Sequence, residues 1–254
     1  MREVLLLHGA PGHAGQWAPV LDRLPCAERV HAITLSFFGT QEVPEGGEAF
    51  GTERHADDIV AYVDNAMTPP VDAVAWSYSS HPLLLAALRR PDLFARLYLY
   101  EPGLPTYVTD QGELRAFEED AGAAFGPIAA ALQADGNEAA VAALFDSSGG
   151  EGCWVSLASD RQEIYLASCG MMPLLMGGGQ PPTPISAEDV ASLVLPLTVA
   201  MGSETRPVFA VPSRGLAKAV PTARLQIVDQ SDHMLPEVDP SRFAELLEEW
   251  LECA

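Results

Sequence analysis

Ser77 stands at the centre of the segment Ala75-Trp76-Ser77-Tyr78-Ser79, which a largely apolar run, residues 71–75, precedes and a helix-like run, residues 81–88, follows. A strand, a sharp turn and a helix in this order lift a serine hydroxyl clear of a sheet, where it can act as a nucleophile. The residues two before and two after such a serine must be small, because the turn brings backbones close together. Ala75 and Ser79 meet this need imperfectly, since glycine is the usual occupant of both places. An ordinary helix N-cap is the alternative role for the serine.

A base for this serine is found near the other end of the chain. Residues 223–228 read as a strand, and the loop Asp229-Gln230-Ser231-Asp232-His233-Met234 follows before an amphipathic helix over residues 242–251. An imidazole in a loop at a strand end can serve as a general base. We therefore expect His233 to activate Ser77.

The first residues supply a third part of this chemistry. Val4 to Leu7 is a short apolar run typical of a strand, and it ends in His8-Gly9-Ala10-Pro11-Gly12 before a helix expected to begin near Gln16. A glycine-rich loop after a strand can turn main-chain N–H groups toward the serine. His8 and His13 are expected to line the mouth of the site or to satisfy loop carbonyls, and His31, His55 and His81 to be structural.

With these segments the chain resembles the α/β-hydrolases, from the HGAPG loop through AWSYSS to the SDHM segment. The order nucleophile, acid, histidine is also that of this superfamily. One departure concerns the acid, which in the family usually follows the strand expected at residues 197–201 in a turn written G-x-x-D. This chain has Gly202-Ser203-Glu204-Thr205 there, and a threonine cannot act as a carboxylate.

The histidine still needs an acceptor for its second ring N–H. We expect Glu101 to provide it, because Glu101 directly follows the strand 97–100 beside the nucleophile's strand. Haloalkane dehalogenases with a glutamate at this strand end are similar, and so are the zearalenone lactone hydrolases, which combine it with a serine nucleophile. A carboxylate here could instead cap the following turn or stay solvated. Glu204 is the alternative acid, and Asp229 and Asp232 are further candidates that we expect to be exposed.

The resemblance implies an α/β fold with a mostly parallel six-stranded sheet and helices on both faces. The expected strands alternate with helical stretches, as this fold requires; they are residues 4–7, 30–34, 71–75, 97–100, 197–201 and 223–228. The antiparallel strands that often open the fold are expected to be missing. We expect a core of residues 1–102 and 193–254, and a helical lid over residues 103–192 with helices at 113–133, 138–145 and 161–172.

The composition of the chain limits the kinds of partner that the protein can bind. The chain has 254 residues, 48% of them hydrophobic, and a formal net charge of −21. These values suit one domain with a sizeable core, and so acidic a surface argues against nucleic acids and anionic membranes. Four scattered cysteines favour free thiols in a reducing compartment, so we expect a cytoplasmic protein without a membrane segment. The sequence implies no metal or organic cofactor. It leaves open whether two copies of the chain form a homodimer.

The sequence thus predicts a serine hydrolase that cleaves a carboxylic ester or lactone of a largely apolar small molecule. We expect the N–H groups of Ala10 and Tyr78 to bind the oxyanion, Ala10 because Pro11 has no N–H to offer. A lyase or C–C bond hydrolase with the same three residues is an alternative. A non-catalytic small-molecule receptor or carrier is another, and the irregular A-x-S-x-S turn keeps it open.

Overall fold

A single parallel sheet organises the chain in the computed structural model, which describes residues 2–43 and 49–251. Among these residues the sheet has six strands in the order β2-β1-β3-β4-β5-β6, and each pair of neighbours is parallel. The strands are β1 (Val4–Leu7), β2 (Val30–Ile33), β3 (Val71–Trp76), β4 (Phe94–Tyr100), β5 (Leu197–Gly202) and β6 (Ala223–Val228). The expected six-stranded parallel sheet is confirmed, and β1 and β6 have the expected bounds.

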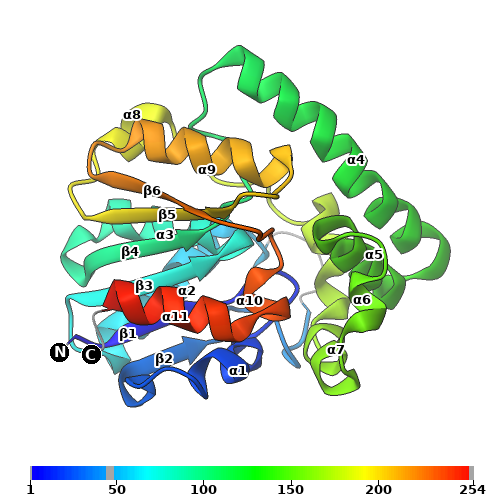
Figure 1. The fold of residues 1–254 in the computed structure, drawn as a ribbon, viewed down its shortest axis with the longest axis horizontal. Helices are drawn as coiled ribbons and strands as arrows, with labels where there is room; N and C mark the ends of the chain where they lie inside the picture. Colours follow the sequence, from blue (N-terminus) through cyan, green and yellow to red (C-terminus); the bar gives the residue numbers. More distant parts are fainter. Residues whose placement is uncertain (1, 44–48, 252–254) are drawn as a thin grey trace.

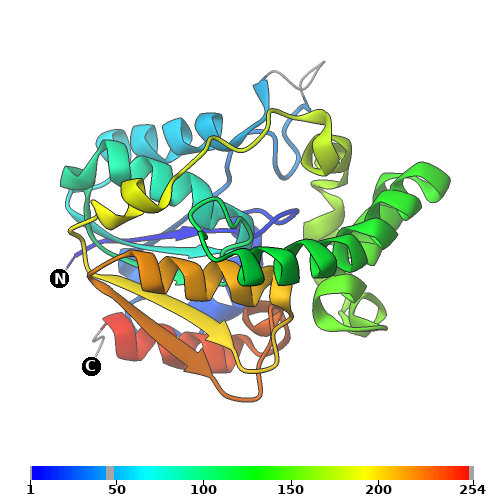
Figure 2. The ribbon, with the colours of Figure 1, turned by 90° about the horizontal axis from the view of Figure 1, so that it is seen from above.

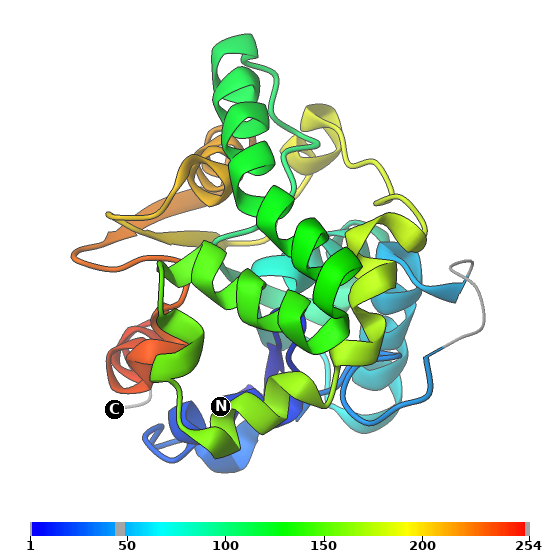
Figure 3. The ribbon, with the colours of Figure 1, turned by 90° about the vertical axis from the view of Figure 1, so that its right-hand side faces the viewer.

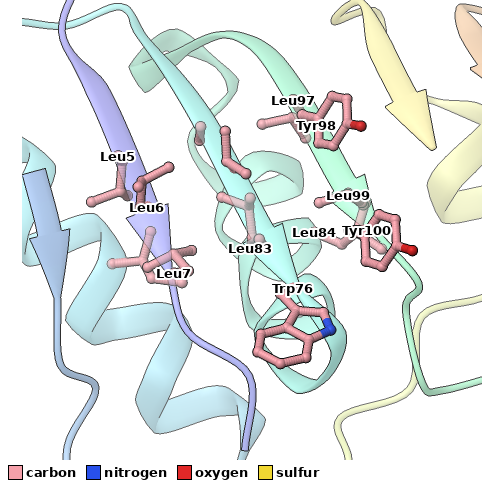
Figure 4. Packing of buried hydrophobic residues seen from close by; sticks show 14 of the residues in the cluster. Leu5, Leu6, Leu7, Trp76, Leu83, Leu84, Leu97, Tyr98, Leu99 and Tyr100 are labelled. Atoms are coloured by element: carbon pink, nitrogen blue, oxygen red, sulfur yellow. The ribbon is translucent and has the colours of Figure 1, made fainter. Parts of the chain in front are cut away.

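The central strands are buried on both faces. Every residue of β1 and of β3 is buried, as expected for parallel strands that helices cover on two sides. Leucine side chains of β1 and β4 pack beside those of helix α3 (Ser80–Arg89) in Figure 4. This rigid core carries the strand ends from which the polar residues of the site project.

Helices cover the two faces in separate groups. On one face α1 (Ala18–Leu21) contacts α11 (Pro240–Leu251), and on the other α2 (Thr52–Ala66) packs on α3. Figure 2 shows α2 and α3 on the opposite side of the sheet from α11. Helices α8 (Ala187–Ala191) and α9 (Pro207–Ala219) continue the layer of α3. Helix α11 is amphipathic as expected, because its apolar residues Phe243, Leu247 and Leu251 are all buried.

Between β4 and β5 the chain leaves the sheet. This segment contains α4 (Gln111–Asp135), α5 (Asn137–Gly149), α6 (Cys153–Ser156) and α7 (Ser159–Leu166). Figures 1 and 3 show these four helices beyond the carboxyl ends of the strands. Helix α4 begins where the side chain of Asp110 accepts the N–H groups of Gly112 and Glu113, at 2.8 and 3.0 Å, and it ends before Gly136 at φ 89°.

One helix of this segment differs from the expectation. A helix over residues 161–172 was predicted, but α7 ends at Leu166 and only a short 3-10 turn, Cys169–Met171, follows. The hydroxyl of Ser168 between them accepts the N–H of Gly39, at 2.6 Å. The local sequence pattern favours a continuous helix through Ser168, but this residue is held instead by its contact with the distant loop of Gly39.

The cysteines also correct the prediction. Cys153 and Cys169 are free, but Cys26 is disulfide-bonded, and Cys253 lies outside the described residues. The expectation of four free thiols, made from their scattered positions, is wrong for Cys26, because sequence spacing alone does not reveal disulfide pairing. The cysteines therefore do not indicate a reducing compartment. Over residues 2–43 and 49–251, no helix is both long and apolar enough to span a membrane.

Candidate active site

Ser77 occupies a strained turn at the end of β3. Its φ is 57°, in the left-handed region that non-glycine residues rarely adopt. Such strain costs on the order of 1–3 kcal/mol and is concentrated at functional sites. The turn lies against the first loop of the chain, since a Cβ added to Gly9 would lie 3.6 Å from the Cβ of Ser77 and 3.1 Å from the ring of Trp76. A glycine at position 9 therefore allows the loop to approach the serine.

Ser79 explains why this turn works without its usual second glycine. The residue is fully buried, and its hydroxyl donates a hydrogen bond to the main-chain oxygen of His8. The side chain thus joins the turn after β3 to the loop after β1. Ser79 stands where glycine is usual in this turn, and its hydrogen bond gives it a structural role.

Two side chains hold the loop of His233 against the sheet. The indole Nε1 of Trp76 donates to the main-chain oxygen of His233 at 3.0 Å, and the hydroxyl of Tyr100 donates to that of Asp232 at 2.6 Å. Both donors are buried at strand ends, and Figure 4 shows Trp76 and Tyr100 at the same end of β3 and β4. The residues just before Ser77 and just before Glu101 thus fix the position of the imidazole.

The imidazole lies between the serine and the glutamate. His233 Nε2 is 3.0 Å from Ser77 Oγ, and its Nδ1 is 2.9 Å from Glu101 Oε2. An ionised carboxylate only accepts hydrogen bonds, so Nδ1 carries the proton and Nε2 is left to accept that of the serine. This is the tautomer in which a histidine can work as a base toward Ser77.

Glu101 is buried and strained. None of its surface is exposed, and its φ is 49°. Besides the imidazole it accepts the N–H of Gly202 on Oε1 at 2.8 Å and the hydroxyl of Thr205 on Oε2 at 2.7 Å. A buried carboxylate needs such donors to offset its lost hydration. The alternatives of a solvated or turn-capping glutamate do not describe this environment.

The other acidic candidates lie elsewhere. Glu204 is exposed, and its main-chain N–H donates to Ser231 O at 2.9 Å. Asp229 is exposed as well, and Asp232 uses Oδ1 to accept the N–H of Met234 at 2.8 Å. Among the described residues, the carboxylate placed on His233 is that of Glu101.

An aromatic ring from α9 covers the imidazole. Phe209 stacks on His233 with ring centroids 3.5 Å apart and planes 5° from parallel. Phe209 is buried beside Val208, and Phe117 and Ala121 of α4 pack on this pair. Nothing in the local sequence indicates this contact.

Thr205 is a further residue of the site, because its hydroxyl donates to Glu101. The sequence offers one sign of this position, since Thr205 stands where the resemblance to the α/β-hydrolases places the acid.

The expected oxyanion donors lie on the two loops that meet at the serine. Ala10 is half-buried and follows Gly9, whose main-chain oxygen accepts the N–H of Gly12 at 2.7 Å and closes the loop. Tyr78 follows Ser77 in the short 3-10 turn Ser77–Ser79. Its hydroxyl is 2.7 Å from Nδ1 of His55, whose Nε2 is 3.0 Å from the main-chain oxygen of Ser36.

Burial keeps two histidines near the serine neutral. Burial lowers the pKa of His55 to about 4 and that of His8 to about 3. Neutral His55 donates from Nε2 to a carbonyl, so Nδ1 accepts the hydroxyl of Tyr78. Neutral His8 donates from Nδ1 to Gly9 O at 3.1 Å and accepts the N–H of Leu35 on Nε2 at 3.1 Å. His8 therefore satisfies a loop carbonyl, and His55 anchors the residue after the serine.

An ion pair fastens the segment of α4–α7 to the loops of the site. Arg161 of α7 binds Glu237 through Nε at 2.8 Å and Nη2 at 2.6 Å, and Nη2 also donates to Gln16 O at 2.8 Å. The hydroxyl of Tyr165 donates to the same carboxylate. Burial, with a smaller contribution from Arg161, lowers the pKa of nearby His13. The helices beyond the strand ends are thus tied to the chain just after His233.

Comparison with known proteins agrees with this architecture. The model of a family described as the alpha/beta hydrolase family matches residues 4–246. No curated protein matches the sequence. Among solved structures, an esterase from Thermogutta terrifontis is similar, with a TM-score of 0.74 and 20% identity over 99% of this chain and 90% of that one.

Two further solved structures are similar over the whole chain. An esterase from Rhodococcus sp. ECU1013 has a TM-score of 0.77 at 17% identity, covering 99% of this chain and 90% of that one. An enol-lactonase from Burkholderia xenovorans LB400 has a TM-score of 0.73 at 14% identity, covering 99% and 91%. Similarity at these identities establishes the fold alone.

Proposed function

Because the chain belongs to the alpha/beta hydrolase family, we propose that it is a serine hydrolase of carboxylic esters or lactones. The observation that carries the proposal is the pair of hydrogen bonds that joins Ser77 to His233 and His233 to Glu101, at 3.0 and 2.9 Å. The left-handed backbone of Ser77 and Glu101 supports it, since strain of this kind is retained at functional sites.

In the proposed reaction Ser77 is the nucleophile and His233 the base. Nε2 of His233 takes the proton of the Ser77 hydroxyl as Oγ attacks the carbonyl carbon, and Glu101 stabilises the imidazolium. The N–H groups of Ala10 and Tyr78 bind the oxyanion of the tetrahedral intermediate. The imidazolium then protonates the leaving alkoxide, and an acyl-enzyme remains. Water deprotonated by the same nitrogen releases the acid and restores the serine.

We propose an apolar small molecule as the substrate. Aromatic side chains gather around Tyr78, the residue after Ser77, where Phe38 and Phe50 pack against its ring with centroids 5.8 and 6.4 Å away. The similar solved structures include esterases and an enol-lactonase. The net charge of −21 disfavours polyanionic partners through simple repulsion. Residues 103–192 are the proposed lid over this site.

A substrate panel tests the proposal. Hydrolysis of p-nitrophenyl esters with increasing acyl length and of a set of macrolactones is measured for the wild type and for Ser77→Ala. We expect the wild type to cleave at least one class and the variant to lose turnover by about 10³-fold or more. Ser192→Ala is the matched control, since Ser192 is exposed and its hydroxyl donates to the main-chain oxygen of Asp189, away from Ser77, His233 and Glu101.

The panel also separates the alternatives. Unchanged hydrolysis in Ser77→Ala, with ligand binding preserved, favours the non-catalytic receptor or carrier. A wild type that cleaves none of these esters and lactones, but breaks a C–C bond in a separate assay with β-diketones, favours the lyase or C–C bond hydrolase.

A further inference from the structure

Glu101 depends on a hydroxyl from the next strand end. Oε2 of Glu101 accepts the Nδ1 proton of His233 at 2.9 Å and the hydroxyl proton of Thr205 at 2.7 Å. The two donors therefore converge on one oxygen atom. Oε1 is held separately, by the N–H of Gly202 at 2.8 Å. The three donors come from β5, the turn after it and the loop after β6.

The geometry of a glutamate makes the Thr205 contact important. A glutamate has a third side-chain torsion, which is broad and has no strong rotamer preference of its own. Rotation about that torsion moves both oxygens together, and any turn of the carboxylate takes Oε2 away from the imidazole. The N–H of Gly202 holds one oxygen and the hydroxyl of Thr205 the other, so the carboxylate is restrained from both sides.

Thr205 is itself held in place. Its main-chain N–H donates to Gly202 O, so that residues 202–205 form a turn directly after β5. The next residue, Arg206, binds Asp120 of α4 through Nε and Nη2, at 2.9 and 2.6 Å, and Asp120 also accepts the N–H of Val208 at 2.9 Å. The turn with Thr205 is therefore fastened on both sides.

We propose that Thr205 is a positioning residue for the reaction, holding the Glu101 carboxylate in the orientation that keeps the Nδ1 proton on His233. The inference rests on the proposed function and adds a residue to it. Thr205 acts through Glu101, and the chemistry on the substrate stays with Ser77 and His233. Loss of the hydroxyl therefore slows turnover while substrate binding is retained.

Three variants test this role. Thr205→Val removes the hydroxyl and keeps the side-chain shape, Thr205→Ser keeps the hydroxyl, and Thr222→Val makes the same change where a hydroxyl donates to Leu195 O on the surface. We expect Thr205→Val to lower kcat about 10-fold or more with KM within about threefold. Thr205→Ser stays within about threefold of the wild type, and Thr222→Val is unchanged.

A second readout does not depend on turnover. In ¹⁵N-histidine spectra, the wild type and Thr205→Ser should show His233 as the single Nδ1–H tautomer, and Thr205→Val should show a mixture or loss of that signal. Melting temperatures recorded alongside separate this effect from unfolding.

The outcomes distinguish the two proposals. If Ser77→Ala abolishes hydrolysis but Thr205→Val keeps both its kcat and the Nδ1–H signal, the role of Thr205 is wrong and the hydrolase stands. If Ser77→Ala leaves hydrolysis intact, the hydrolase proposal fails, and the tautomer of Thr205→Val still decides whether Thr205 positions Glu101.

Discussion

The ring of Phe209 lies flat on the imidazole of His233, with centroids 3.5 Å apart and planes 5° from parallel. Phe209 belongs to the first turns of α9, a helix whose first residues bind Asp120 of α4. The base of the proposed reaction is therefore held by a helix that also contacts the segment beyond the strand ends.

Replacement of Phe209 by leucine tests this stack. The variant keeps an apolar side chain but loses the aromatic face, and aromatic pairs contribute about 0.5–1.5 kcal/mol beyond their buried area. We expect kcat to fall about 2- to 10-fold with KM little changed. Phe125→Leu makes the same change at a residue that is 39% exposed and should have no effect. Equal kcat values for the two variants would contradict a role for the stack.

The identity of the acid is tested by two glutamine substitutions. Glu101→Gln leaves an amide beside Nδ1, which no longer stabilises an imidazolium and can favour the wrong tautomer, so we expect kcat to fall about 10³- to 10⁴-fold. Glu204→Gln changes an exposed side chain and should stay within about twofold. Steady-state kinetics on the best ester of the panel measure both. A larger loss in Glu204→Gln would overturn the assignment of Glu101.

The ion pair between Arg161 and Glu237 should contribute strongly to stability. The Glu237 side chain is 2% exposed and that of Arg161 15%, so Glu237→Gln leaves a buried guanidinium without its charge partner. We expect the free energy of unfolding to fall by about 3–5 kcal/mol. Glu53→Gln breaks a pair with Arg89 on the surface and should cost less than about 1 kcal/mol. Urea unfolding that gives the same loss for both variants would refute this difference.

Buried neutral histidines should make stability fall with acid. Burial lowers the pKa of His8 to about 3 and of His55 to about 4, whereas the unfolded chain binds these protons near pH 6.5. The unfolded state therefore carries more protons as the pH drops below about 6.5, and stability is lost down to the folded pKa values. The expected slope is up to about 1.4 kcal/mol per pH unit for each histidine.

His55→Gln separates this contribution from that of other groups. A glutamine amide can accept the hydroxyl of Tyr78 and donate to Ser36 O without titrating. Urea unfolding between about pH 7 and pH 4 should give a shallower slope for the variant than for the wild type. High salt reduces the contribution of the acidic surface and should leave the difference in place. Identical slopes would mean that His55 does not carry the effect.

The sequence predicts the sheet and the convergence of the polar residues for one physical reason. Parallel strands bring their carboxyl ends to one edge, so residues after β3, β4 and β6 must come near one another. Ser77, Glu101 and His233 follow these strands and are hydrogen-bonded in the structure. Apolar runs bounded by glycine and polar residues were enough to locate the strands.

The remaining features depend on packing between distant segments. The stack of Phe209 depends on how α9 lies across the sheet edge, and the hydroxyl of Thr205 matters only because a glutamate arrives from β4. The end of α7 is set near Ser168 by a loop more than 100 residues away in the sequence, and the disulfide at Cys26 has no signature in the cysteine spacing. Local periodicity contains none of this information.

In the proposed reaction Ser77 is a nucleophile activated by His233. Labelling with a fluorophosphonate followed by peptide mass spectrometry tests this role most directly. We expect one label per chain, located on Ser77, with the labelling rate reduced about 10³-fold or more in His233→Ala. A label on another residue, or equal labelling rates with and without the imidazole, would contradict the account.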